Sequence, residues 1–175
     1  MATIPGLVLS NKQKSPDAVA LRYKQLGIWN TYTWNDYYNE VSVLVDAYKS
    51  LSVKKGTVVA VYGNNVPKLI FSIAAVQTLG GIVAPMHPES TEGELKTILN
   101  NSNAEILIAE DQQQVDTFLK VEPECNVKKI VYLDGRGMTS YDNNKLNSYD
   151  SLVSEAKNES IESMISSLSD SEVAF

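Results

Sequence analysis

The stretch from residue 57 to residue 85, TVVAVYGNNVPKLIFSIAAVQTLGGIVAP, decides the fold of this 175-residue chain. Its first part, TVVAVY, is a continuous apolar run rich in β-branched residues, which is typical of a strand buried on both faces of a parallel sheet. Gly63 and two asparagines then turn the chain, and Pro67 begins a helix that we expect to run to about Leu79. Gly80 suits the left-handed conformation that ends many helices.

The alternation of strand and helix continues downstream. GIVAP supplies a second buried strand, which we expect Pro85 and Pro88 to end. Thr91 and Glu94 form a capping-box pattern for a helix to about Asn101. EILIA and KIVYL then read as strands, with the helical stretch DQQQVDTFLK between them. This rhythm predicts right-handed crossovers and a three-layer α/β/α fold with a mainly parallel sheet.

Upstream of this unit, the pattern predicts a helix, a hairpin and a second helix. Thr3 can cap a short N-terminal helix that has Pro5 in its first turn. AVALRYK and GIWNTYTW read as two strands joined at residues 25–27, which predicts a β-hairpin. Thr33 with Asp36 forms another capping box before a long amphipathic helix.

The C-terminal part reads differently. DGRGMTSYDNN is a loop, and two short helices are expected near 148–157 and 159–168. Residues 150–175 carry six carboxylates and one lysine, so this segment accounts for −5 of the net charge of −6 of the whole chain. We therefore expect one domain over residues 1–175, in which residues 150–175 form an acidic, solvated tail of helix and linker.

Composition excludes several classes of protein. With 15 basic residues against 21 acidic ones, a nucleic-acid partner is not indicated. The single cysteine, Cys125, rules out an internal disulfide, and an unreactive thiol is expected there. The N-terminus does not resemble a signal peptide, and the longest apolar stretch is too short for a transmembrane segment. A cytoplasmic location is the expectation that follows.

The motifs that carry phosphate chemistry are missing from the sequence. It contains neither G-x-x-x-x-G-K-[ST] nor G-x-G-x-x-G after a strand. GNNVP follows the first parallel strand, where such sheets often bind ligands, but its main role is expected to be the turn. DGRG at 134–137 is also expected to be a turn. Taken on their own, the residues indicate a fold and not a reaction.

His87 is the only histidine, so a metal site built on several histidines is excluded within this chain. It lies between two prolines at the carboxyl end of a strand, the edge where α/β proteins place functional groups. Packing within a loop is the alternative interpretation. Glu89 beside it does not make a catalytic pair, because no nucleophile with matched spacing accompanies the two residues.

Three segments resemble one family. ALRYKQLGIWNTYTWNDYYNEV, KKGTVVAVYGNN and AAVQTLGGIVAPMHPESTEGELKTILNNSNAEILIAEDQQQVDTFL are similar to the N-terminal part of AMP-forming acyl-CoA synthetases. The similarity is strongest to the long-chain fatty acid–CoA ligase branch of this adenylate-forming superfamily. It extends over essentially the whole chain, in order and spacing, from about Pro5 to Phe175.

The resemblance implies a two-step reaction for the complete enzyme. A carboxylate and Mg-ATP give an acyl-adenylate and pyrophosphate, and the thiol of CoA then displaces AMP. Fatty acid, ATP, Mg²⁺ and CoA are thus the implied substrate and cofactors. The family's phosphate loop, its Tyr-Gly-x-Thr-Glu segment and its C-terminal domain are not in this sequence, so we expect the chain to be an inactive N-terminal fragment. The ending SDSEVAF is expected to lead into a strand that continues beyond it.

Only His87 and Ser90 are candidates for contact with a ligand. In related acetyl-CoA synthetases, the loop equivalent to MHPES lies near the nucleotide of CoA. The segment here lacks the aromatic-Gly-Gly pattern of that loop, and no catalytic or metal-binding residue can be carried over from the family.

Two alternatives stay open from the sequence. The chain could be a stand-alone, non-catalytic α/β binding module, or part of an acyl-AMP ligase or adenylation domain that serves a carrier protein. The fragment reading implies two partners: the remainder of its own chain, and a second copy through an exposed apolar surface.

Overall fold

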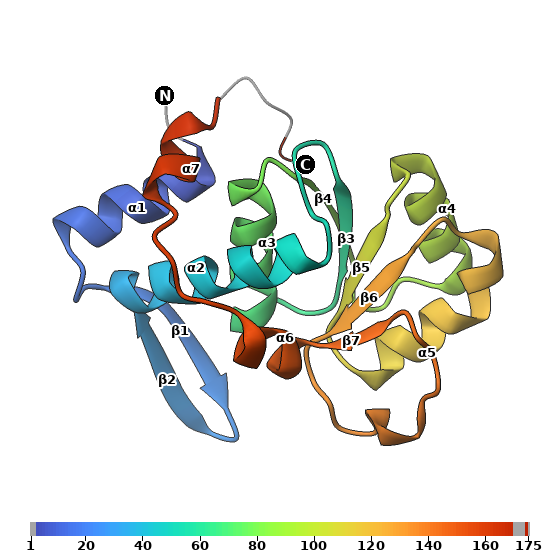
Figure 1. Cartoon of the computed structure of the whole chain (residues 1–175). Helices are drawn as coiled ribbons and strands as arrows, with labels where there is room; N and C mark the ends of the chain where they lie inside the picture. Colours follow the sequence, from blue (N-terminus) through green and yellow to red (C-terminus); the bar gives the residue numbers. More distant parts are fainter. Residues whose placement is uncertain (1–2, 170–173, 175) are drawn as a thin grey trace.

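The computed structural model describes residues 3–169 and residue 174, and Figure 1 shows the arrangement of the helices and strands. In chain order these elements are α1 (Ile4–Lys14), β1 (Val19–Gln25), β2 (Ile28–Thr33), α2 (Trp34–Ser50), β3 (Val58–Tyr62), α3 (Pro67–Thr78), β4 (Ile82–Met86), α4 (Glu92–Ser102), β5 (Ile106–Ala109), α5 (Gln112–Val121), β6 (Lys129–Tyr132), β7 (Leu146–Ser148), α6 (Tyr149–Glu155) and α7 (Glu162–Ser167). Short 3-10 turns, η1 (Glu122–Glu124) and η2 (Met138–Ser140), flank β6.

A five-stranded sheet in the order β4-β3-β5-β6-β7 forms the centre, and every neighbouring pair in it is parallel. Alternate residues of β3 divide between two cores. Val59 and Val61 pack with α2 and α3, whereas Ala60 and Tyr62 pack with α4 and α5. Because both faces of the strand are covered, all four side chains are buried, at 2% exposure or less. The predicted three-layer α/β/α architecture is confirmed.

The predicted helix starts are confirmed at atomic detail. In α2 the backbone N–H of Asp36 donates to Thr33 Oγ1 at 3.1 Å, and the N–H of Thr33 donates to the Asp36 carboxylate at 2.9 Å. Thr91 and Glu94 make the same reciprocal pair at the start of α4. A third capping box opens α5 and was not predicted. Each box satisfies N–H groups that have no partner within their helix.

The prediction that GIVAP is a buried strand ended by Pro85 is wrong in part. β4 is the edge strand of the sheet, and Pro85 lies within it with its side chain exposed. The N–H of Ile82 points towards β3, where it donates to Thr57 O, so alternate residues point to the outer edge. Pro85 is one of these outward residues, and a missing N–H is tolerated there because no strand of the sheet lies beyond.

The sequence interpretation also missed a strand. β7 occupies three residues in a region expected to be loop and helix start, and it pairs in parallel with β6. Three residues are too few for a periodic pattern to show. The two helices expected near 148–157 and 159–168 are present as α6 and α7.

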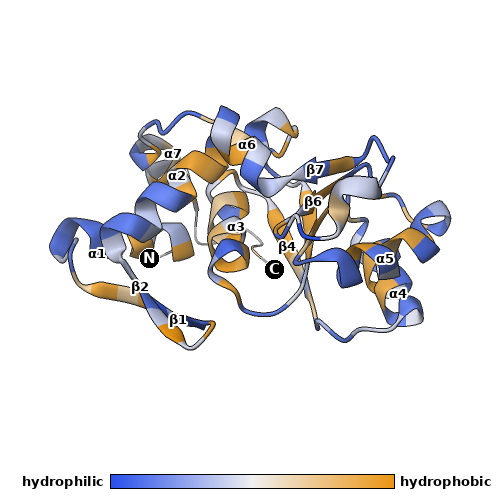
Figure 2. Cartoon of the chain, turned by 90° about the horizontal axis from the view of Figure 1, so that it is seen from below, coloured by the Kyte–Doolittle hydropathy of each residue, from blue (hydrophilic) through white to orange (hydrophobic). Residues whose placement is uncertain are grey.

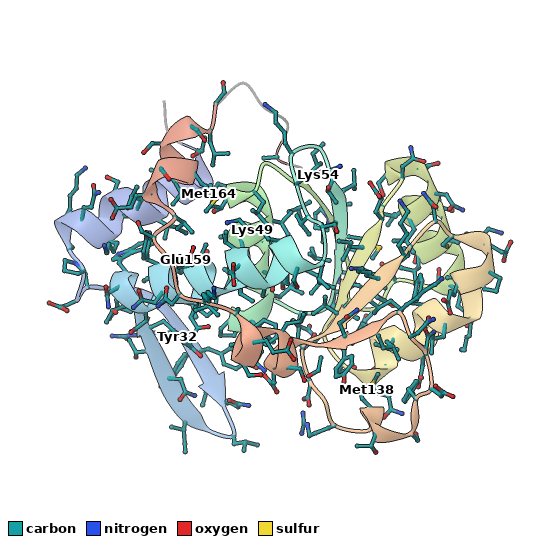
Figure 3. All side chains as sticks on the ribbon, viewed as in Figure 1. Tyr32, Lys49, Lys54, Met138, Glu159 and Met164 are labelled. Atoms are coloured by element: carbon teal, nitrogen blue, oxygen red, sulfur yellow. The ribbon has the colours of Figure 1, made fainter. Side chains whose placement is uncertain are left out.

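The expectation of a solvated acidic tail is corrected by the packing of α6 and α7. Ile161 and Ile165 belong to the core, with 1% and 5% exposure. The N–H of Ile161 donates to Tyr38 Oη at 3.3 Å, and Ser42 of α2 donates to the carbonyl of Glu159, which Figure 3 labels beside that helix. Residues 149–168 are therefore part of the fold, and their carboxylates lie on its outer side. Of the expected acidic linker, residues 170–173 and 175 lie outside the described residues.

We expect Ile161→Ala to lower the free energy of unfolding by about 2–5 kcal/mol, because it removes buried carbons and leaves a cavity among α1, α2 and α7. Urea denaturation followed by circular dichroism measures the loss. Ile28→Ala is the matched control, since Ile28 is 68% exposed and its loss should change stability by less than about 0.5 kcal/mol. Equal effects of the two substitutions would show that the C-terminal segment is not part of the core.

Candidate functional site

The carboxyl ends of β3, β5 and β6 open onto a cavity of about 510 Å³. The start of α3 forms one wall, the loops after β5 and β6 form a second, and the inner face of the hairpin closes the third. Tyr32, labelled in Figure 3 where the hairpin meets the helix layer, lies on that third wall and packs edge-on against Phe71. The charged lining residues are Lys68, Glu110, Asp111, Asp134, Arg136 and Asp150.

The position of this cavity follows from the order of the strands. After β3 the chain crosses by α3 to β4 on one side, and then by α4 to β5 on the other side of β3. Helix α3, which follows β3, and helix α5, which follows β5, cover opposite faces of the sheet, so the chain diverges beyond the ends of these two strands and a crevice forms there. Open α/β sheets bind ligands at such a point, which makes this cavity the candidate site of the described residues.

The GNN segment has the predicted role of a turn, and Glu110 holds it in place. The Glu110 carboxylate accepts hydrogen bonds from Asn64 N at 2.6 Å and from Asn64 Nδ2 at 2.9 Å. A Cβ on Gly63 would lie 2.5 Å from the Cβ of Glu110, closer than two side chains can approach. The close approach of the two loops therefore requires glycine at this position.

Both cations of the cavity are neutralised by residues of the cavity itself. Lys68 Nζ lies 2.7 Å from Asp150 Oδ1, donates to Leu133 O at 3.1 Å and stands over the ring of Tyr149. Arg136 Nη2 lies 2.6 Å from Asp134 Oδ2. Glu110 and Asp111 add negative charge without further cations, so the lining carries four carboxylates and two cations.

This charge does not fit the phosphates of ATP, which need an excess of cations or free N–H groups. The lining of the cavity would repel a triphosphate. Among residues 3–169 and 174, no group of three or more His, Cys, Asp or Glu residues is placed to hold a metal ion.

DGRG forms the predicted turn after β6. Asp134 Oδ1 accepts from the N–H of Arg136 at 3.0 Å, and the guanidinium of Arg136 donates to both carboxylate oxygens. The hydrogen bond from the Arg136 side chain is the main reason that the pKa of Asp134 is lowered from its ordinary value. The turn is thus closed by its own charged pair.

His87 and Ser90 lie together, in a turn that follows β4 and is separate from the lining of the cavity. Ser90 N donates to His87 O at 3.0 Å, and His87 Nδ1 accepts from Glu89 N at 3.2 Å. Tyr62 Oη donates to Ser90 O at 2.8 Å and fixes the turn to the sheet. Within the described residues, the Nε2 of the exposed His87 and the hydroxyl of Ser90 have no hydrogen-bond partner.

The unreactive thiol expected at Cys125 stays a prediction, and the surroundings of the side chain favour it. It is half-buried in the turn before β6, and burial, followed by the nearby Glu124, raises its pKa. A thiol with a raised pKa holds little of the nucleophilic thiolate at neutral pH.

Sequence reasoning missed the cavity residues Lys68, Glu110 and Asp134. A signal for two of them was present, because Glu110 comes directly after β5 and Asp134 comes shortly after β6, where a parallel sheet collects functional groups at one edge. No sequence pattern indicates that the Lys68 side chain pairs with Asp150.

The parallel sheet covered on both faces, with a crevice at its carboxyl edge, defines a doubly wound α/β protein. The family model of AMP-binding enzymes matches residues 9–169, and the chain belongs to this family. The resemblance found in the sequence is confirmed. Among the described residues, no helix is long and apolar enough to cross a membrane.

Curated relatives are similar over parts of the chain. A human long-chain-fatty-acid–CoA ligase, ACSBG1, is 24% identical over 131 residues, which are 75% of this chain and 18% of that protein. A crotonobetaine/carnitine–CoA ligase of Shigella flexneri is 28% identical over 86 residues, which are 49% of this chain and 17% of the relative. The chain therefore spans less than a fifth of the length of these two relatives.

Solved structures share the fold at low identity. A mutant form of coronafacic acid ligase from Pectobacterium brasiliense superposes with a TM-score of 0.77 at 15% identity, covering 89% of this chain and 30% of that one. NpsA of Klebsiella oxytoca, in complex with 3-hydroxyanthranilyl-AMSN, gives a TM-score of 0.64 at 19% identity and covers 91% of this chain and 27% of that one.

We expect Gly63→Ala to destabilise the protein by about 1–3 kcal/mol, because the added Cβ would collide with Glu110. Gly93→Ala is the control, and we expect it to change the stability in the opposite direction. No atom lies within 4 Å of its added Cβ, and Gly93 is in α4, so alanine should stabilise the helix by about 0.5–1 kcal/mol. Thermal and urea unfolding measure the stability of both variants. A stability unchanged by Gly63→Ala would contradict the close approach of the loops.

The Asp134–Arg136 pair predicts a pH dependence. The pKa of Asp134 is lowered in the folded state, so the pair stabilises the protein above the ordinary carboxyl pKa of about 4 and loses this effect as pH falls through the lower folded value. Arg136→Gln should raise the pKa of Asp134 towards its ordinary value in an NMR titration. The stability difference between the variant and the unmodified chain should disappear in acid. A pKa unchanged by the substitution would rule out the pair as the cause.

Proposed function

We propose that this chain is the N-terminal part of an ATP-dependent fatty acid–CoA ligase and is inactive without the remaining polypeptide. The proposed reaction converts a fatty acid, ATP and CoA to acyl-CoA, AMP and pyrophosphate through an acyl-adenylate. The observation that carries the proposal is the match to the AMP-binding enzyme family over residues 9–169, together with the 18% share of the human ligase that the chain spans.

The fatty acid assignment is supported by relatives named long-chain-fatty-acid–CoA ligases from human, rat, cattle and mouse. Crotonobetaine/carnitine–CoA ligases are also similar to the chain. All of these names include ligation to CoA, whereas the acid that is ligated differs among them. The relatives therefore support CoA as the acyl acceptor more strongly than they support a fatty acid as the substrate.

The inactivity of the chain on its own is supported by the charge of the cavity. Lys68 and Arg136 are paired with Asp150 and Asp134, so the lining has no excess of cations for a phosphate. The described residues thus supply a scaffold for the complete enzyme. When bound in the complete enzyme, ATP supplies the AMP that activates the carboxylate.

His87 and Ser90 are proposed to face CoA in the complete enzyme. They stand at the carboxyl edge of the sheet in a turn held by Tyr62, with the His87 Nε2 and the Ser90 hydroxyl unpaired among the described residues. A neutral imidazole and a hydroxyl can donate hydrogen bonds to the phosphates or the amides of CoA.

The edge strand β4 is the proposed docking place for the remaining polypeptide. Val83 N donates to Ala174 O at 3.0 Å, so residue 174 already lies on this edge. Gln77 Nε2 approaches the same carbonyl at 3.5 Å, and Gln77 Oε1 is buried with no partner within the described residues. An extended segment that follows Ala174 could supply the missing donor and add a strand. Without it, an open edge of this kind favours self-association.

Two other functions compete with this proposal. A stand-alone binding module would need no further polypeptide and would be a monodisperse monomer. An acyl-AMP ligase or an adenylation domain would form the acyl-adenylate but transfer the acyl group to a carrier protein. The similarity to NpsA, solved with 3-hydroxyanthranilyl-AMSN, is the observation that supports the adenylation domain as an alternative.

The test compares this chain with the protein encoded by the complete reading frame that contains it. We expect the 175-residue chain to give no ATP–pyrophosphate exchange with fatty acids, and the longer protein to give exchange that depends on the fatty acid. Addition of CoA to the longer protein should then yield acyl-CoA, detected by mass spectrometry.

Three results would decide against the proposal. Exchange by the 175-residue chain would contradict its inactivity, and exchange without acyl-CoA would favour an acyl-AMP ligase or adenylation domain. A reading frame that ends at Phe175 would favour the binding module. In the longer protein, His87→Ala should raise the KM for CoA and leave ATP–pyrophosphate exchange unchanged, while Lys157→Ala, distant in sequence, is the control.

A further inference from the structure

The hairpin of β1 and β2 carries the most exposed apolar surface among the described residues. Its base packs against the helix layer, its tip projects away from the helices and the main sheet, and hydrophobic residues mark its strands (Figures 1 and 2). At its tip, Leu26 is 96% exposed, Ile28 68% and Trp29 64%, whereas other large hydrophobic residues reach at most 49%. Three neighbouring apolar side chains thus face water at one projecting point.

The backbone at the tip gives no reason for a leucine. Leu26 and Gly27 form the two-residue connection with φ of 49° and 83°. Two positive φ values are characteristic of a type I′ turn, whose first position favours Asn, Asp or Gly. Leucine is uncommon in this conformation and gains no burial from it. A strained residue with a fully exposed apolar side chain indicates a contact made outside the chain.

The charge of the hairpin is opposite to that of the protein. Residues 18–35 contain Arg22 and Lys24 and no carboxylate, although the whole chain has a net charge of −6. Both cations are exposed, and Lys24 Nζ lies 5.8 Å from the centre of the Trp29 ring. The tip therefore combines apolar side chains, an aromatic residue and two cations directly behind them.

This combination matches the interface of an anionic bilayer. Apolar side chains lower their free energy at the boundary of headgroups and acyl chains, and tryptophan is favoured at the level of the headgroups. Lysine and arginine extend past such side chains to reach phosphate. The negative charge elsewhere on the protein would orient the hairpin, and no other face, towards an anionic surface.

We propose that the hairpin tip is a membrane-contact site, which places Leu26, Ile28 and Trp29 in the interface of an anionic lipid bilayer. Arg22 and Lys24 bind the lipid phosphates from behind the tip. This inference goes beyond the ligase function and does not depend on it. Three side chains and two cations provide weak, reversible binding, so the protein would exchange between the surface and solution.

The experiment is flotation of the 175-residue chain with phosphatidylcholine vesicles, with and without phosphatidylserine. We expect binding only to the anionic vesicles, weakened by salt. Arg22→Gln with Lys24→Gln should lower the partition coefficient about 25-fold, since each cation near an anionic surface contributes about fivefold. Leu26→Asn should lower it about tenfold by removing apolar carbons from the interface.

Matched variants separate this role from folding. Asparagine suits positive φ, so Leu26→Asn should keep or raise the stability of the hairpin. Leu7→Asn, at a 49% exposed position on α1, should bind vesicles like the unmodified chain. Tryptophan emission should shift to shorter wavelength with anionic vesicles, and Trp29→Phe should abolish the shift.

Three outcomes would overturn the proposal. One is equal partition to vesicles with and without phosphatidylserine. Another is equal loss of binding in Leu26→Asn and Leu7→Asn. The third is a tip variant that has a different oligomeric state from the unmodified chain in analytical ultracentrifugation without vesicles. Such a change would show that a second copy of the chain covers the tip. None of these results bears on pyrophosphate exchange by the longer protein.

Discussion

The burial of β3 on both faces is the constraint on which the rest of the structure depends. Its backbone is hydrogen-bonded to β4 on one side and to β5 on the other, and its side chains alternate between two cores. A strand in this position cannot reach water, so each of its faces requires a helix layer. The helices α3 and α4 must then cross on opposite faces, and the crevice at the carboxyl edge follows from that crossing.

Much of this arrangement could be predicted because its signals are local. Thr33 with Asp36 and Thr91 with Glu94 mark helix starts within four residues, and Gly80 adopts the left-handed conformation expected of it. The predictions that were wrong concern features that depend on segments far apart in the sequence. The edge position of β4 depends on strand order, and the burial of Ile161 depends on a surface provided by α1 and α2 more than a hundred residues earlier.

The candidate site was less predictable than the fold for the same reason. His87 and Ser90 could be proposed from the sequence because they are close together at the end of a strand. The structure places them in one turn, and their contact with a ligand stays a prediction. The cavity unites α3 with the loops after β5 and β6, and its polarity depends on the pair of Lys68 with Asp150, which are 82 residues apart. No pattern within a short window contains that pair.

The contact between the two ends of the described chain has a consequence for synthesis. Helix α7 packs against α1, Lys12 lies 3.6 Å from Glu162, and Ile161 and Ile165 complete the core beside α2. The N-terminal helices are therefore made first, but the part of their apolar surface that lies under α7 is not covered until residues near 165 have left the ribosome. At ordinary translation rates, of about 5–20 residues per second, this surface remains open for several seconds or longer. During that interval a chaperone that binds apolar helices would have its best opportunity to act on the nascent chain.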